Sequence, residues 1–138
     1  MQVSLPLFLS AVLAATFSTG GQACSCAGPG YFGGPDEWAR AVLSEPASGF
    51  VVYAKVESLL PGNSARIRVI ENYTPGQEVN EITGRGGNCG VWFRPGDEAI
   101  FITGNDRLLD LCGKYRPEPD LLQALRARSS SGAKGGGK

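Results

Sequence analysis

The chain has 138 residues, of which 42% are hydrophobic and 19% charged, so it is long enough for one domain with a single modest core. It contains 13 basic and 13 acidic residues, but four of the basic ones lie after residue 125, which leaves 9 basic and 13 acidic residues between 24 and 125. The resulting net charge of minus four argues against nucleic acid or an anionic membrane surface as a partner.

Residues 1–23 form a hydrophobic leader. Its apolar run from Leu5 to Phe17 is too short to span a bilayer, and small residues that signal peptidase accepts follow it. We therefore expect a signal peptide, no membrane span, and a secreted or extracellular protein (periplasmic in a bacterium) whose mature chain begins at Cys24. No Lys or Arg precedes the apolar run, which weakens this prediction. Lipidation of Cys24 is the alternative, although Gly21 stands where the lipoprotein signal requires Leu or a similar residue.

The first element of the mature chain is a predicted short helix. Pro35 and the two acidic residues after it are typical of a first helical turn, and the helix should end before Pro46. Trp38, Ala41 and Val42 would lie on its apolar side.

Five segments that follow have the β-branched and aromatic composition of strands and are separated by Gly and Pro turns. They are residues 50–56, 65–70, 78–83, 99–103 and 108–112. Arg66 and Arg68 alternate with apolar residues in the second segment, so one face of that strand should be solvated and the other buried. The pattern predicts a mainly β fold, a five-stranded closed barrel of the OB type with one or two short peripheral helices.

Pro119 and Asp120 begin a second predicted short helix, whose apolar stripe of Leu121, Leu122 and Leu125 should pack on the barrel. We place the folded domain at residues 24–125. Residues 126–138 are rich in Ser, Gly and Lys and have little to bury, so we expect a disordered tail there.

Four cysteines remain after the leader: Cys24, Cys26, Cys89 and Cys112. An even number in a small exported chain indicates two disulfides. Pairing Cys24 with Cys26 would close a small, strained ring, which leaves two long-range pairings; we prefer Cys24 with Cys89 and Cys26 with Cys112. A zinc site is the competing use, but the chain has no CxxC spacing and no histidine.

Enzymatic activity is not expected. Without histidine there is no Ser-His or Cys-His pair, and the adjacent carboxylates Asp36-Glu37 and Asp97-Glu98 fall at a helix start and a turn, where solvated caps are usual. The glycine cluster at residues 84–87 lacks the Lys-Ser or Lys-Thr of a phosphate-binding loop, so we interpret it as a flexible loop. We expect the protein to have no cofactor of its own.

Several motifs in a fixed order resemble the N-terminal domain of the tissue inhibitors of metalloproteinases, which belongs to the netrin-like superfamily of OB-type barrels. They are Cys24-Ser25-Cys26, Tyr53-Ala54-Lys55-Val56, Cys89-Gly90, the run 96–104 and Leu108-Leu109-Asp110-Leu111-Cys112. The resemblance covers residues 24–113. It implies disulfides between Cys24 and Cys89 and between Cys26 and Cys112, in agreement with the preferred pairing.

The resemblance also implies a function and a partner. The α-amine and carbonyl oxygen of Cys24 would chelate the catalytic zinc of a metalloprotease, at the position that the hydrolytic water occupies. Ser25 would enter the primary specificity pocket of the protease. Five further residues would complete the inhibitory ridge of a monomeric protein: Cys26, Ala27, Gly28, Gly87 and Asn88, the last two beside Cys89.

Two departures from the family pattern bear on this prediction. The family carries a third cysteine about ten residues after the second, and residues 33–40 contain none. Gly28 stands where the family usually has proline, so the ridge could be looser. The alternative is a netrin-like extracellular module that binds a protein or a glycan without inhibiting a protease, its paired cysteines serving only to staple the N-terminus to the barrel.

Overall fold

The computed structural model describes residues 24–44 and 49–135, with side chains as far as residue 130. The expected signal peptide, residues 1–23, lies outside this described part. The elements in chain order are η1 (Pro29–Phe32), α1 (Pro35–Leu43), β1 (Val51–Leu60), β2 (Ser64–Asn72), β3 (Glu81–Gly84), β4 (Glu98–Ile102), β5 (Leu108–Leu109), η2 (Leu111–Gly113), β6 (Lys114–Tyr115) and α2 (Pro119–Gly135).

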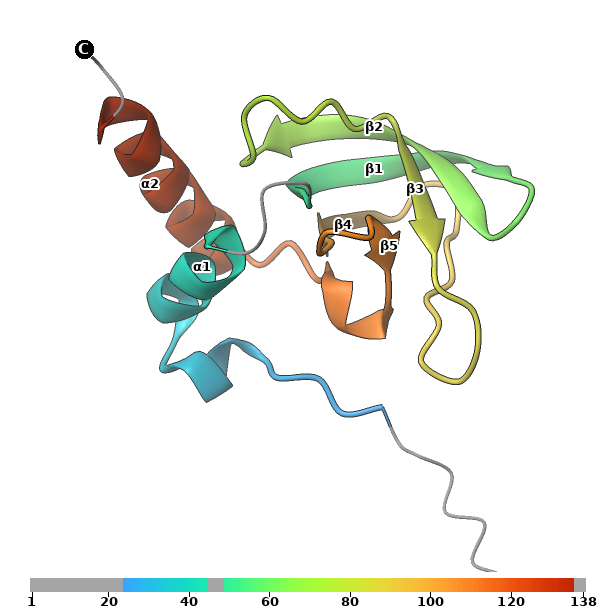
Figure 1. Cartoon of the computed structure of the whole chain (residues 1–138), viewed down its shortest axis with the longest axis horizontal. Helices are drawn as coiled ribbons and strands as arrows, with labels where there is room; N and C mark the ends of the chain where they lie inside the picture. The colour runs from blue at the N-terminus through green and yellow to red at the C-terminus, as the bar shows by residue number, and fades with distance from the viewer. Residues whose placement is uncertain (1–23, 45–48, 136–138) are drawn as a thin grey trace, which may run out of the picture.

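The strands form one sheet that curls into a nearly closed barrel, with α1 and α2 together at one side (Figure 1). The strand order is β5-β3-β2-β1-β4-β6, and every pair is antiparallel except β3 with β5. The predicted mainly β barrel with two peripheral helices is therefore confirmed. The expected strand count is wrong, because the segment predicted as one last strand over 108–112 is a two-residue strand followed by η2, and β6 adds a sixth.

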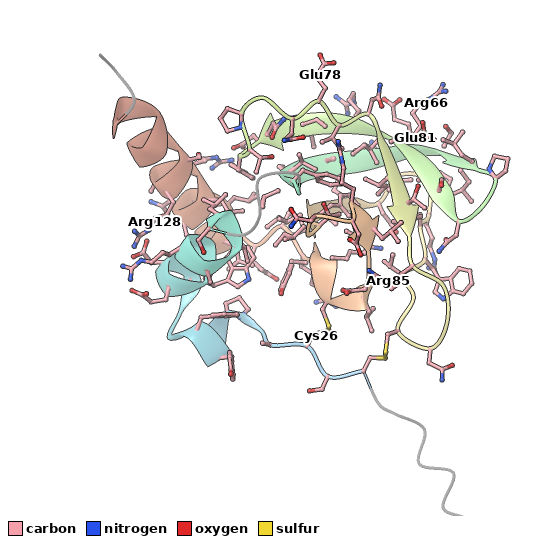
Figure 2. All side chains as sticks on the ribbon, viewed as in Figure 1. Cys26, Arg66, Glu78, Glu81, Arg85 and Arg128 are labelled. Atoms are coloured by element: carbon pink, nitrogen blue, oxygen red, sulfur yellow. A yellow bond between two sulfur atoms is a disulfide. The ribbon has the colours of Figure 1, made fainter. Side chains whose placement is uncertain are left out.

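The β1–β2 hairpin is the largest unit of the sheet. Its turn needs left-handed backbone at Gly62 (φ 77°) and Asn63 (φ 53°), which glycine and asparagine adopt at little cost. In β2 the expected alternation is present, since Ala65 and Ile67 are buried and Arg66 is exposed on the outer side (Figure 2).

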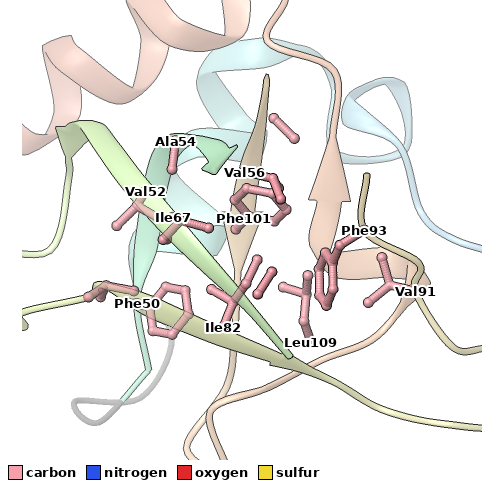
Figure 3. Close-up of a cluster of buried hydrophobic side chains, with 13 residues drawn as sticks. Phe50, Val52, Ala54, Val56, Ile67, Ile82, Val91, Phe93, Phe101 and Leu109 are labelled. Atoms are coloured by element: carbon pink, nitrogen blue, oxygen red, sulfur yellow. The ribbon is translucent and has the colours of Figure 1, made fainter. Parts of the chain in front are cut away.

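The barrel interior is filled by apolar side chains from the strands β1 to β5 and from the loops between them (Figure 3). Phe101 of β4 is fully buried and meets Phe93 edge to face, with ring centroids 6.3 Å apart. Leu109 of the short strand β5 is also fully buried, which holds that strand in the barrel with only two residues paired. Each such side chain contributes about 1.5–3 kcal/mol through its removal from water.

A second apolar cluster lies between the helices and the outer face of the barrel. Trp38 of α1 and Leu125 of α2 are fully buried there, against Ile100 and Val51 of the sheet. The two helices therefore pack on each other and on β1 and β4. None of the helices in the described part of the chain is long and apolar enough to cross a membrane.

Helix α2 continues to Gly135, so the predicted disordered tail over 126–138 is wrong for residues 126–135; residues 136–138 lie outside the described part. Two arginines fix the helix to the rest of the domain beyond Leu125. Arg126 donates through Nε and Nη2 to the carboxylate of Glu71 on β2, with Nε 2.8 Å from Oε2. Arg128 Nη2 lies 2.7 Å from Oδ2 of Asp36 on α1. The helix is thus held to the sheet and to α1 beyond its last buried leucine.

Candidate functional site

The candidate site is the N-terminal segment, residues 24–28, which runs in extended form past one end of the barrel before η1 begins (Figure 1). Cys24 is half-buried, whereas Ser25, Cys26 and Ala27 are exposed. The segment belongs to no strand of the sheet. Its exposed part is therefore residues 25–27, between the half-buried Cys24 and Gly28.

Two disulfides tie this segment to the barrel. Cys24 is bonded to Cys89 with 5.6 Å between their Cα atoms, and Cys26 is bonded to Cys112 with 5.1 Å between theirs. The pairing expected from the sequence is confirmed, and Cys26 is seen reaching toward the barrel in Figure 2. All four cysteines are used in this way, so none is left for a zinc site.

Non-covalent contacts also reach this segment. The Tyr115 hydroxyl of β6 donates to the carbonyl oxygen of Ala27 at 3.3 Å, and Cys112 Sγ lies 3.9 Å from the carbonyl oxygen of Ser25. The Gly28 carbonyl accepts the amide of Tyr31 at 3.0 Å, which begins η1. The two bridges are the covalent part of this anchoring, and these contacts hold the carbonyl oxygens of Ser25, Ala27 and Gly28 in addition.

The segment after the ridge is anchored by packing and by an ion pair. Trp38 of α1 is fully buried, and its ring meets that of Tyr115 with centroids 5.2 Å apart. Arg128 of α2 holds Asp36 in the first turn of the same helix and lowers the pKa of that carboxyl. Packing and an ion pair therefore fix residues 35–43 without a third disulfide.

The second part of the site is a turn at residues 87–90. The Gly90 amide donates to the Gly87 carbonyl at 3.0 Å, and Gly87 has a φ of 90°, which favours glycine. A Cβ at Gly90 would lie 2.6 Å from the carbonyl oxygen of Arg85, so the loop closes tightly on itself there. Gly87, Asn88 and Cys89 are exposed, and the Cys24–Cys89 bridge places this turn beside the start of the ridge.

Both bridge partners on the barrel are held by short hydrogen bonds. The Leu111 amide donates to the Cys89 carbonyl at 3.0 Å, and Oδ1 of Asp110 accepts the Cys112 amide at 2.9 Å. Gly90 and Asp110 form an isolated antiparallel bridge between the two loops. The two anchoring loops are therefore one connected unit, so the residues predicted for the ridge do come together.

The chemistry of this ridge is almost wholly that of the backbone. Residues 24–28 and 87–89 contain no Asp, Glu, Lys, Arg or His, and offer one hydroxyl and one amide besides their main-chain groups. Among the described residues, no three Cys, Asp or Glu side chains gather as a metal site. An α-amine at Cys24, if the leader is removed, would be the one titrating group of the ridge.

One exposed residue close to the site was not singled out by the sequence analysis. Trp92 is 77% exposed, while its neighbours Val91 and Phe93 are buried. The sequence offered no clear signal for it, because three large apolar residues follow one another here outside any strand.

Comparison of the chain with protein-family models, with curated proteins and with solved structures finds no significant match. The similarity to the metalloproteinase inhibitors consequently rests on the motifs and their order, and it stays a prediction.

Proposed function

We propose that the protein is a secreted inhibitor of zinc metalloproteases, in which the α-amine and carbonyl oxygen of Cys24 chelate the zinc of the protease. The observation that carries the proposal is the fastening of an extended, exposed segment by bridges at its first and third residues, Cys24 and Cys26. The bridges are also typical of proteins in oxidising compartments, which supports export. Removal of residues 1–23 is a premise of the proposal.

The proposed ligand is chemically suited to zinc. An α-amino group has a pKa of about 7.7–8.0, so its deprotonation at neutral pH costs only about 1 kcal/mol. The amine nitrogen and the carbonyl oxygen of one residue form a five-membered chelate ring, and catalytic zinc sites keep a position open for such ligands. No side chain of the ridge carries a charge that would have to be desolvated on docking.

Pre-organisation is the second support. A flexible peptide loses conformational freedom when it enters a cleft, and each immobilised residue costs about 1–2 kcal/mol for its backbone. The two bridges remove much of that freedom before binding, with Cys24 and Cys26 already fixed relative to the turn at 87–89. Ser25 lies between the two fixed positions and is exposed, as a residue entering a specificity pocket must be.

The proposal is tested by comparing the mature protein beginning at Cys24 with the same protein extended by one N-terminal alanine. Both are assayed against a panel of zinc metalloproteases, after mass spectrometry of the secreted protein has established its first residue. The extension moves the amine away from the chelating position, so inhibition should fall at least a hundredfold. Equal inhibition by the two forms would overturn the chelation mechanism.

A netrin-like module that binds a protein or a glycan is the second candidate, and the connected anchoring loops favour it equally, since bridges that staple a chain end to a barrel need no protease. Acetylation of the α-amine separates the two. It abolishes inhibition if the amine binds zinc, and it leaves partner binding unchanged if the module acts through another surface.

A further inference from the structure

A surface groove begins at the anchoring loops and continues away from the ridge. Its volume is about 340 Å³. The groove is lined by residues from the loop after β3, the turn before β4, η2 and β6. The lining residues used below are Gly90, Trp92, Arg94, Asp97, Leu111 and Lys114.

The groove has an apolar wall that is exposed. Trp92 is 77% and Leu111 is 44% exposed, and both line the groove. Val91, next to Trp92, is buried in the barrel core, and the Lys114 ammonium donates to the Trp92 carbonyl at 3.3 Å. The backbone that carries the indole is therefore fixed on both sides. Tryptophan on rigid backbone is the residue type most enriched where binding energy concentrates in interfaces.

The groove also has a net positive charge. Lys114 Nζ lies 3.5 Å from Oδ2 of Asp97, which leaves that pair neutral. Arg94 makes no ion pair with any residue that the structure describes. An occupant with a carboxylate near Arg94 would thus meet an uncompensated cation at the end of an apolar wall.

The groove is continuous with the ridge through the same two loops. Gly90 follows Cys89 directly, and Leu111 precedes Cys112 and donates its amide to the Cys89 carbonyl. A molecule that covers the Cys24–Cys89 and Cys26–Cys112 bridges would reach the mouth of the groove within one residue on either loop.

We infer that this groove is a second contact for the metalloprotease of the proposed function. It would take a segment at the rim of the protease's active-site cleft that places an apolar side chain against Trp92 and Leu111 and an Asp or Glu near Arg94. The inference rests on the proposed function. The chelating amine contacts a zinc that all such proteases share, so the groove would determine which of them are bound tightly.

The test uses the full mature chain and the metalloprotease that it inhibits best in the panel. Trp92→Ala removes most of the apolar wall and should raise the inhibition constant at least tenfold, chiefly through faster dissociation. Arg94→Glu should also weaken inhibition, and more so at low salt. Leu59→Ala is the matched control, because Leu59 is 55% exposed but lies in the β1–β2 hairpin outside the groove; its inhibition constant should not change. Thermal unfolding followed by circular dichroism establishes that the variants fold.

The outcomes separate the inference from its premise. If the wild-type protein inhibits and Trp92→Ala inhibits equally well within twofold, the groove is not a protease contact, although the chelation mechanism stands. If Trp92→Ala and Leu59→Ala weaken inhibition alike, the effect is not specific to the groove and the inference is again overturned. If the wild-type protein inhibits no metalloprotease, the proposed function and this inference fail together.

Discussion

Replacement of Cys26 and Cys112 together by alanine should destabilise the protein by an amount that follows from the chain topology. A bridge stabilises chiefly by restricting the unfolded chain, and the restriction depends on the length of the loop it closes. With Cys24–Cys89 intact, the loop closed by the second bridge passes through the first. Its length is the sum of two sequence separations, 2 from Cys24 to Cys26 and 23 from Cys89 to Cys112, which is 25 in all.

For a loop of about 25 residues the chain-entropy relation gives an entropy of about 12 cal/mol/K, or about 3.5 kcal/mol at room temperature. The same bridge acting alone would close 86 residues and contribute about 4.6 kcal/mol. We therefore expect loss of one bridge to cost about 3–4 kcal/mol, and loss of both about 8 kcal/mol, which is comparable to the whole stability of a small domain.

The measurement is equilibrium unfolding in urea, followed by far-ultraviolet circular dichroism and extrapolated to water. Ser25→Ala is the control, because Ser25 lies in the same exposed segment and carries no bridge. A loss below about 1 kcal/mol in the double replacement of Cys26 and Cys112 would refute the reasoning. It would mean that the unfolded chain is not appreciably restricted by this bridge.

Three further predictions concern the barrel, the turn and the helix contact. Leu109→Ala should lower the free energy of unfolding by about 2–5 kcal/mol, because that side chain is fully buried, whereas Leu108→Ala, at 36% exposure, should cost less than about 1 kcal/mol; urea unfolding checks both, and equal losses would show that β5 does not close the barrel. Gly90→Ala should reduce both stability and inhibition, since its Cβ would meet a backbone oxygen, while Gly86→Ala has open space and should leave both unchanged; matching behaviour of the two variants would contradict the described turn. Hydrogen bonds from the Arg126 guanidinium lower the pKa of Glu71 below its ordinary value of 4.5. The stability that these hydrogen bonds contribute is therefore complete above pH 4.5, and it is lost as the pH falls through the lower pKa of the folded state. Acid titration should therefore show a smaller loss of stability below pH 4.5 in Glu71→Gln than in the wild type, and identical profiles would exclude the ion pair in solution.

The long strands β1, β2 and β4 were predictable because they are rich in β-branched and aromatic residues and are bounded by turns. Alternation of buried and exposed residues adds a second signal in β2, whereas β4 is a continuous buried run from Ala99 to Phe101. The two-residue strands β5 and β6 have no period to detect. Their place in the sheet depends on tertiary contacts, such as the burial of Leu109 and the close approach of Gly113 to the carbonyl oxygen of Ile102, where a Cβ would lie at 2.3 Å.

The end of α2 was mispredicted for a different reason. Composition alone makes a Ser-, Gly- and Lys-rich stretch look disordered, and it does not reveal the partners of Arg126 and Arg128. Their observed partners, Glu71 and Asp36, are 55 and 92 residues away in the sequence. Pairing over such distances follows from the fold and leaves no local pattern. The two disulfides were predictable because four cysteines allow only three pairings, one of which is strained. The groove was not, because it forms only when two loops far apart in the sequence are brought together.

The ridge and the groove are held to the barrel in different ways. The ridge is fastened covalently by the bridges of Cys24 and Cys26. Trp92 in the groove is held by the burial of its neighbour Val91 in the core and by the hydrogen bond from Lys114 to its carbonyl oxygen. Removal of the Cys26–Cys112 bridge should therefore weaken zinc chelation through a loosened ridge while the apolar wall at Trp92 is retained. Under the proposed mechanism, such a variant should bind the protease weakly and still lose affinity when Trp92 is replaced, because the contacts that hold Trp92 do not include that bridge.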